Sequence, residues 1–216
     1  MSETSAELQF WSWFASNQHF YRSMETAADS GRLMNEFEEQ LHAIDEDLYF
    51  EFSEPMENGG NELVITACGK QDKFDCVRAL VAAAPELPGW TIIAFKPAMG
   101  FSFTHDHGDV VLKPSELWFL PLVSKSNPRM LGLRMAVPDL DPTMKDKIIH
   151  SLWIVLDTGL GEVVCAERIK HLEAAMMPTN PANEGFIELN ELPDYLDWID
   201  RRESAAETGL WHLARF

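Results

Sequence analysis

Residues 48–68, LYFEFSEPMENGGNELVITAC, decide the fold class. Every second residue from Leu48 to Phe52 is apolar, and this period of two indicates a strand that is covered on one face. A turn sequence, NGGN at residues 58–61, follows, and an apolar run returns from Glu62 to Cys68. The stretch therefore predicts an antiparallel β-hairpin with a long loop.

Two helices are expected before this hairpin. Residues 4–7, TSAE, have the form of a capping box, in which Thr4 and Glu7 satisfy the first backbone amides of a helix. Mainly aromatic residues then recur at steps of three and four from Phe10 to Met24, which is the spacing of one helical face. After Ser30-Gly31, a second helix is predicted through Leu33, Phe37 and Leu41.

Strands and helices are mixed in the rest of the chain. A third helix should end before Pro85, because proline has no amide hydrogen to donate. A fourth should begin near Thr143 and end at Gly159 or Gly161, and a last one should begin near Pro193. Further strands are predicted at residues 90–96, 109–113, 117–122, 130–137 and 163–169.

These elements indicate an α+β domain. We expect a mixed sheet of about five or six strands, two N-terminal helices and three further helices packed mainly on one side. Residues 1–216 are expected to form a single domain, with the C-terminal segment 179–216 docked on the body. Its core should include seven residues in the apolar phase of their elements: Trp13, Phe14, Phe50, Phe52, Leu80, Ile93 and Leu152.

Composition narrows the class of protein. Hydrophobic residues make up 46% and charged residues 24%, which excludes disordered and collagen-like chains. The three cysteines, Cys68, Cys76 and Cys165, cannot all pair and have no metal-ligand spacing, which favours a reducing compartment. No signal peptide and no run of 18 apolar residues is present, so we expect a cytoplasmic protein without a membrane span.

The net charge is −18, and it is unevenly distributed. Residues 1–69 contain 14 acidic and 2 basic residues, whereas residues 70–150 contain 9 acidic and 10 basic ones. Nucleic acids and phospholipid surfaces are themselves anionic, so binding to either is disfavoured. A basic protein partner is compatible with this charge, and so is a surface that serves solubility alone.

The acidic side chains are densest after the start of the second helix. That helix and the following turn supply the predicted partner-binding residues Glu36, Glu38, Glu39, Asp45, Glu46 and Asp47. Like charges at this density repel one another and destabilise the fold slightly, so a functional reason for them is worth testing.

A histidine pair gives the chain its best metal candidate. His105 and His107 project to the same side of an extended backbone, and with Asp106 they would offer two imidazoles and a carboxylate to zinc, iron or manganese. An exposed loop is the alternative interpretation of the same residues.

Basic residues in the neutral middle of the chain suggest an anion site. Lys96, Lys113 and Arg134 come from neighbouring predicted strands and, if they converge, could receive a carboxylate or phosphate. Salt bridges to the acidic parts of the chain are the alternative.

No catalytic or cofactor signature is found. The triplet Asp157-Thr158-Gly159 matches that of aspartic proteases, but it follows a helical pattern and occurs once, whereas that chemistry needs two aspartates. A nucleophile elbow and a phosphate-binding loop are also missing. We therefore assign no catalytic residue and no cofactor.

Several segments resemble a family of bacterial cytosolic proteins of unknown function. They are the aromatic opening FWSWF at residues 10–14, the two hairpin strands, the segment APELPGWTIIAFKP at residues 84–97, and LDTGLGE at residues 156–162. The resemblance spans residues 8–170 and implies an α+β fold in a bacterial cytoplasm, without any activity. Some similar folds occur among toxin-immunity proteins, which is an analogy at the level of the fold.

Two functions follow as hypotheses. The first is a non-catalytic protein-binding module, of immunity or regulator type, that uses its acidic surface. The second is a metal-dependent hydrolase or isomerase that uses the loop at His105 and His107. The oligomeric state is left open by the sequence.

Overall fold

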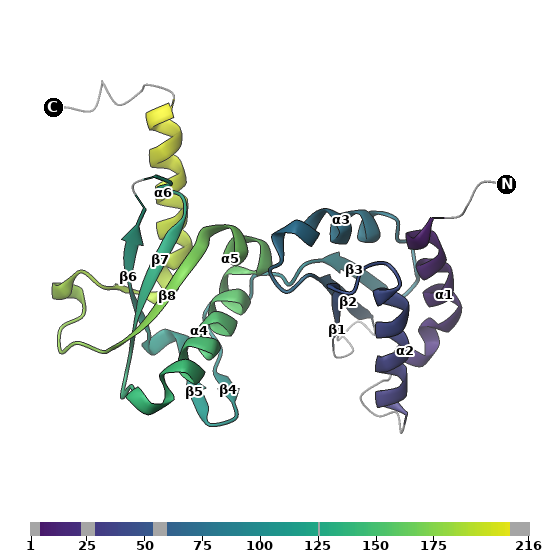
Figure 1. Ribbon diagram of the computed structural model, residues 1–216, viewed down its shortest axis with the longest axis horizontal. Coiled ribbons are helices and arrows are strands. Elements are labelled where there is room, and N and C mark those ends of the chain that lie inside the picture. The colour runs from purple at the N-terminus through teal and green to yellow at the C-terminus, as the bar shows by residue number, and fades with distance from the viewer. Residues whose placement is uncertain (1–4, 23–28, 54–59, 125, 208–216) are drawn as a thin grey trace. The chain divides into compact units, whose positions relative to one another are not determined.

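The computed structural model describes residues 5–22, 29–53, 60–124 and 126–207 (Figure 1). Two compact units make up the chain: unit 1 is Met1–Lys96 and unit 2 is Pro97–Phe216. Each unit has its own helices, sheet and buried side chains. The single domain over residues 1–216 stays a prediction.

The described residues of unit 1 form a three-stranded sheet with three α-helices. Its elements are α1 (Ala6–Tyr21), α2 (Ser30–His42), β1 (Tyr49–Phe52), β2 (Asn61–Thr66), the 3₁₀ turn η2 (Gln71–Lys73), α3 (Phe74–Ala82) and β3 (Trp90–Ala94). Strand β1 pairs antiparallel with β2, which confirms the hairpin expected from the sequence. Strand β3 pairs parallel with β2, so α3 forms the crossover that a parallel connection requires.

Aromatic rings fill the core of unit 1. Phe37 of α2 is completely buried, and its ring centroid lies 4.3 Å from that of Phe50 and 5.1 Å from that of Phe52. Helix α1 begins after Ser5, whose Oγ accepts the amide of Leu8 at 3.4 Å. Thr4, the first residue of the predicted capping box, lies outside the described residues.

The expected core is confirmed in part. Phe14, Leu80 and Leu152 are fully buried, whereas Trp13, Phe50, Phe52 and Ile93 are only half-buried. For the two phenylalanines the reason is the position of β1 at the edge of the described sheet, where no other described strand flanks their side chains.

Unit 2 contains a two-stranded hairpin and a four-stranded sheet with the order β8-β7-β6-β9. Its first elements are β4 (His105–His107), β5 (Val110–Leu112), η3 (Pro114–Glu116), β6 (Trp118–Val123), β7 (Leu131–Val137) and η4 (Pro142–Met144). The others are α4 (Lys145–Leu160), α5 (Glu162–Arg168), β8 (Ile169–Met176), η5 (Ala182–Glu184), β9 (Ile187–Glu188), η6 (Leu189–Glu191) and α6 (Leu192–Glu207).

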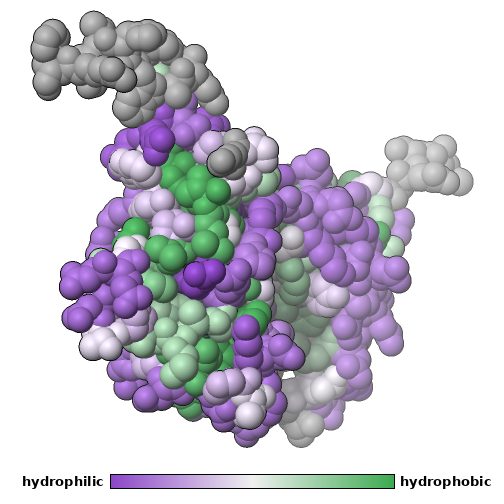
Figure 2. Space-filling view, turned by 60° about the vertical axis from the view of Figure 1, so that its left-hand side comes forward, coloured by the Kyte–Doolittle hydropathy of each residue, from purple (hydrophilic) through white to green (hydrophobic). Residues whose placement is uncertain are grey.

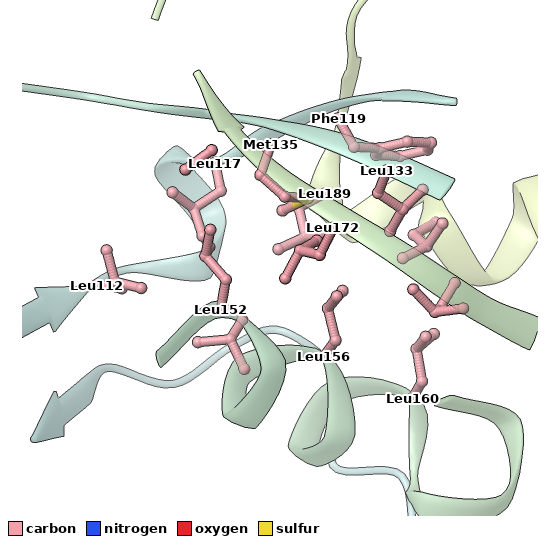
Figure 3. Close-up of a cluster of buried hydrophobic side chains, with 14 of the residues drawn as sticks. Leu112, Leu117, Phe119, Leu133, Met135, Leu152, Leu156, Leu160, Leu172 and Leu189 are labelled. Atoms are coloured by element: carbon pink, nitrogen blue, oxygen red, sulfur yellow. The ribbon is translucent and has the colours of Figure 1, made fainter. Parts of the chain in front are cut away.

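The core of unit 2 lies on one face of the four-stranded sheet. Alternate residues of β6 and β7, among them Phe119 and Leu133, pack with Leu152 and Leu156 of α4 (Figure 3). Helix α6 adds Leu192, Leu196 and Ile199 to the same cluster, and the ring of its Tyr195 lies 5.7 Å from that of Phe119. Both helices therefore pack on the face of the sheet that carries Phe119.

Two expectations about the elements are wrong. The predicted mixed sheet of five or six strands is replaced by sheets of three, two and four strands, because strand pairing depends on distant residues that a local period does not reveal. Residues 163–169 were expected to be a strand, but α5 continues to Arg168 and β8 begins at Ile169. Gly161, with a φ of 79°, makes the turn between α4 and α5, and α5 is one helix more than predicted.

The C-terminal segment docks on unit 2 as far as it is described. Leu192, Leu196 and Ile199 are buried, whereas residues 208–216, which hold the apolar tail, lie outside the described residues. Within the described ranges, no single helix is long and apolar enough to cross a membrane, and α4 with its preceding turn meets these conditions only together with α5, at a bend of 120°.

Candidate functional site

Helix α2 carries the first half of the predicted acidic surface. Leu33, Phe37 and Leu41 bury one face of the helix, so Glu38 and Glu39 extend into solvent. Glu36 is half-buried, and its Oε2 accepts a hydrogen bond from Nη1 of Arg32 at 3.0 Å. Two of the three glutamates on this helix are therefore fully exposed.

The turn after α2 holds an ion-pair cluster instead of open charge. Nζ of Lys73 lies 2.7 Å from Oδ2 of Asp45 and 3.4 Å from Oδ2 of Asp47, and Lys70 donates to Asp47 as well. The hydrogen bond from Lys73 is the main cause that lowers the pKa of Asp45, and the one from Lys70 lowers the pKa of Asp47. Both carboxylates are thus held in the charged form with a cation beside them.

Ion pairs separate the six predicted partner-binding residues into those with a cation beside them and those without one among the described residues. Asp45 and Asp47 are neutralised locally, and Glu36 is paired with Arg32. Within the described residues, no ion pair or hydrogen bond to a side chain involves the carboxylates of Glu38, Glu39 and Glu46, and all three residues are exposed. We call these three residues the open acidic surface.

Sequence reasoning missed the two lysines. They lie 23 and 28 residues after the aspartates that they pair with, on the turn that begins α3. The only local sign is that the acidic stretch before Lys70 and Lys73 contains no basic residue. A gap of this kind in the sequence does not show which residues are in contact in the folded chain.

In unit 2, the predicted metal ligands lie on the hairpin β4–β5. His105 faces Leu112 across the hairpin and His107 faces Val110, so both imidazoles share the apolar face with these two buried residues. Asp106 lies opposite Val111, which is 58% exposed, and therefore points to the other face. The structure brings the two histidines together but separates them from Asp106.

A cavity of about 440 Å³ borders this hairpin. The hairpin contributes His107, Gly108, Asp109 and Val110, and the first turns of α4 contribute Asp146, Lys147, His150 and Ser151. Lys147 and Asp109 form an ion pair at 2.6 Å across it. We call this cavity the histidine pocket; its α4 residues were not among the site residues predicted from the sequence.

His105 lies beside the pocket in an apolar setting. Its Nε2 is buried and has no hydrogen-bond partner among the described residues, and its ring centroid lies 6.2 Å from that of His107. Burial is the main cause that lowers the pKa of His105, and the neighbouring His107 lowers it further. His105 is therefore held in the neutral form.

The pocket does not assemble a metal centre as it stands. The described parts of the chain contain no group of three or more His, Cys, Asp or Glu side chains placed to hold a metal ion. Two imidazoles on one face are an incomplete ligand set, since structural and catalytic zinc sites use at least three protein ligands.

Two of the three predicted anion-binding residues, Lys113 and Arg134, lie in unit 2, and each forms an ion pair there. Nζ of Lys113 lies 3.0 Å from Oε1 of Glu116, and Nε of Arg134 lies 2.9 Å from Oε2 of Glu173. Lys96, the third of these residues, belongs to unit 1. For Lys113 and Arg134 the structure thus shows salt bridges, the alternative interpretation of these residues.

The protease-like triplet lies inside α4, whose last turn contains Asp157-Thr158-Gly159. The carbonyls of Thr158 and Gly159 accept the amides of Met99 and Gly100 at 2.9 and 3.2 Å, so this turn serves to hold the segment that leads to the hairpin. Because the triplet forms a helical turn, its structure agrees with the sequence-based argument against an aspartic protease.

Comparisons with models of protein families, with curated proteins and with solved structures find no match for this chain. The function must therefore be argued from the residues and their geometry.

Proposed function

We propose that the protein is a non-catalytic binding module that recognises a basic protein partner through the open acidic surface, Glu38, Glu39 and Glu46. One observation carries this proposal. The three carboxylates are exposed and form no ion pair with any described residue, whereas the adjacent Asp45 and Asp47 are neutralised by Lys70 and Lys73. The chain thus has lysines available nearby but leaves these three charges open.

Long-range electrostatics support the same function. Unit 1 contains 17 acidic and 6 basic residues, so its field attracts cations well beyond the contact itself. Exposed carboxylates of this kind increase the rate of association and select the sign of the partner's charge. A regulator or an immunity-type inhibitor of a basic protein uses a surface of this chemistry.

A cytoplasmic setting belongs to this proposal. Cys68, Cys76 and Cys165 are all thiols, which supports a reducing compartment. The negative charge also argues against nucleic acid or an anionic membrane as the partner.

The experiment is affinity capture from a lysate of the source cells, with bound proteins identified by mass spectrometry. Wild-type protein is compared with Glu38→Lys/Glu39→Lys/Glu46→Lys. A matched control, Asp106→Lys/Glu184→Lys/Asp194→Lys, makes the same change in net charge at three exposed carboxylates of unit 2.

We expect one basic protein to be captured by the wild type and by the control, and to be lost with the variant of the open acidic surface. Capture should also weaken steeply with salt, because the Debye length falls from about 30 Å at 0.01 M to about 10 Å at 0.1 M. Equal capture by all three proteins would contradict the proposal, since it would show that these carboxylates are only a solvated surface.

The histidine pocket favours a second candidate, the metal-dependent hydrolase or isomerase. His105 and His107 share one face of the hairpin, and His150 borders the same cavity as His107. A third ligand would have to move into place on binding. Metal analysis of purified protein tests this function: a stoichiometric transition metal that is lost in His105→Ala/His107→Ala supports it, and metal-free protein of unchanged stability contradicts it.

A further inference from the structure

The histidine pocket lies between the turn of the β4–β5 hairpin and the first turns of α4 (Figure 1). Its volume of about 440 Å³ falls in the range of about 300–1,000 Å³ that is usual for the sites of small organic ligands. Val110 and Ser151, which are 5% and 2% exposed, form its floor, whereas His107 and His150 are exposed at its mouth. The pocket therefore leads from solvent to the core of unit 2, to which Val110 belongs.

Ser151 places a polar group at the floor of the pocket. Its hydroxyl has no hydrogen-bond partner among the described residues, although the residue is almost completely buried. A buried hydroxyl that forms no hydrogen bond lowers the stability of the folded chain. Ser151 therefore offers one donor and one acceptor to a molecule that enters the pocket.

The charged side chains that line the pocket leave one carboxylate open. Asp109 and Lys147 lie 2.6 Å apart and neutralise each other. Asp146, the residue before Lys147 on α4, is exposed and forms no ion pair with any described residue. The formal charge that is left over in the lining is thus negative, and it favours a cationic ligand over an anionic one.

The open carboxylate and the buried hydroxyl lie apart along α4. Asp146 and Ser151 are five residues apart, which corresponds to a rise of about 7.5 Å along the helix axis. The ligands of a metal ion lie about 2–2.6 Å from it, and the described parts of the chain contain no group of three or more ligating side chains placed to hold one. An organic molecule with a polar group at each end can reach both residues, and its apolar middle can pack on Val110.

The two imidazoles at the mouth add acceptors beside this carboxylate. His150 follows Asp146 by four residues, so both side chains lie on one face of α4. Neither His107 nor His150 has a hydrogen-bond partner among the described residues. A primary ammonium group has three N–H donors, which match one carboxylate and two ring nitrogens.

We propose that the histidine pocket binds a small organic amine. Asp146 and the two imidazoles hold its ammonium group, and Ser151 forms a hydrogen bond with a hydroxyl, carbonyl or second amino group at the other end of the molecule. The site uses none of the residues of the open acidic surface, so this inference does not rest on the proposed function.

The shape of the pocket favours a small molecule over a protein partner. Hydrophobic side chains also lie over the four-stranded sheet of unit 2, with hydrophilic residues between them (Figure 2). There Trp118 lies beside the exposed Glu188 of β9, and a mixed surface of this kind specifies no ligand. The pocket instead combines a limited volume with a few placed polar groups, which select a ligand by size and by hydrogen bonding.

The test is an NMR titration of the full chain, labelled on its backbone nitrogens and dialysed against a chelator. The probes are aminopentanol, pentanol and hydroxyvalerate, which carry a hydroxyl on chains of similar length and end in an ammonium, a methyl or a carboxylate group. Asp146→Asn and Ser151→Ala each remove one anchor. Asp106→Asn is the matched control for charge, because Asp106 lies opposite Val111 on the other face of the hairpin. Circular dichroism confirms that each variant is folded.

We expect the wild type to bind aminopentanol with a Kd of about 1 mM or lower, with shifts at the amides of His107 and Ser151. Pentanol and hydroxyvalerate should bind at least about tenfold more weakly. Asp146→Asn should weaken binding of aminopentanol about tenfold and Ser151→Ala about threefold, because a hydrogen bond to a charged group contributes more than one between neutral groups. Asp106→Asn should bind like the wild type.

Three outcomes would overturn the inference: no binding of aminopentanol, equal binding of hydroxyvalerate, or binding that Asp146→Asn leaves unchanged. A pocket that binds zinc alone but not aminopentanol would also overturn it, in favour of the metal-dependent function. Capture of a basic protein should be unaffected by Asp146→Asn, so the amine site and the proposed function can each fail while the other stands.

Discussion

The ring of Phe101 occupies the space that a side chain on Gly159 would enter. A β-carbon at position 159 would lie less than 3.0 Å from three atoms of this ring, a separation that real structures essentially never show. Phe101 is 6% exposed and belongs to the core of unit 2, so the ring has little freedom to move aside. Gly159 therefore lies inside α4 for a reason of packing, and the helix ends at Leu160, with Gly161 as its C-cap.

Replacement of this glycine should destabilise the protein. Alanine normally stabilises a helix interior relative to glycine, but at Gly159 overpacking should outweigh this gain and cost about 1–3 kcal/mol in the free energy of unfolding. The measurement is chemical denaturation. Gly31→Ala is the control, because nothing lies within 4 Å of a β-carbon there and stability should be unchanged or higher. Equal effects of the two substitutions would refute the packing explanation.

Phe37 should be the most sensitive aromatic residue of unit 1. It is completely buried and touches rings from α1 and β1, so Phe37→Ala should cost about 3–5 kcal/mol of unfolding free energy. Phe50→Ala should cost less, because Phe50 is half-buried at the sheet edge. Phe20 is 50% exposed, and its truncation should change stability by less than about 0.5 kcal/mol in the same denaturation experiment.

The ion-pair cluster after α2 should make unit 1 sensitive to acid. The folded state lowers the pKa values of Asp45 and Asp47, so their stabilising effect is complete above the ordinary aspartate pKa of 3.8 and is lost as the pH falls through the lowered values. Denaturation of Lys73→Met between pH 7 and pH 2 should show a shallower acid loss than that of the wild type. Identical pH profiles would show that the pairs do not contribute to stability.

His105 should affect the stability of the protein in a different pH range from that of Asp45 and Asp47. Its pKa in the folded state lies below the ordinary 6.5, so the unfolded chain binds its proton more readily and stability falls as the pH drops below about 6.5. His105→Phe should remove this loss, whereas His19→Gln at an exposed position of α1 should keep it. Stability measured at pH 7.5 and pH 5.5 distinguishes the two outcomes, and a wild type that is equally stable at both values would contradict the burial argument.

The sequence predicts the residues of the candidate sites less completely than it predicts the helices and strands. The hairpin residues His105 and His107 could be selected because alternate residues of a strand share a face, and that relation is local. The α4 residues His150 and Ser151, which border the same cavity, lie more than 40 residues away, and only the packing of α4 on the hairpin brings them there. The spacing groups six acidic residues of α2 and its turn, but ion pairs with Arg32, Lys70 and Lys73 leave only three of them open.

Consecutive residues are enough to predict the hairpin of β1 and β2, the apolar faces of α2 and α4, and the strands β6 and β7, because a hydrophobic period is a local property. Four features become visible only in the folded chain: the parallel pairing of β3, the division of strands among three sheets, the helix at residues 162–168, and which carboxylates meet a lysine. These features depend on contacts between residues far apart in the chain, and the free energy of such contacts outweighs local preference.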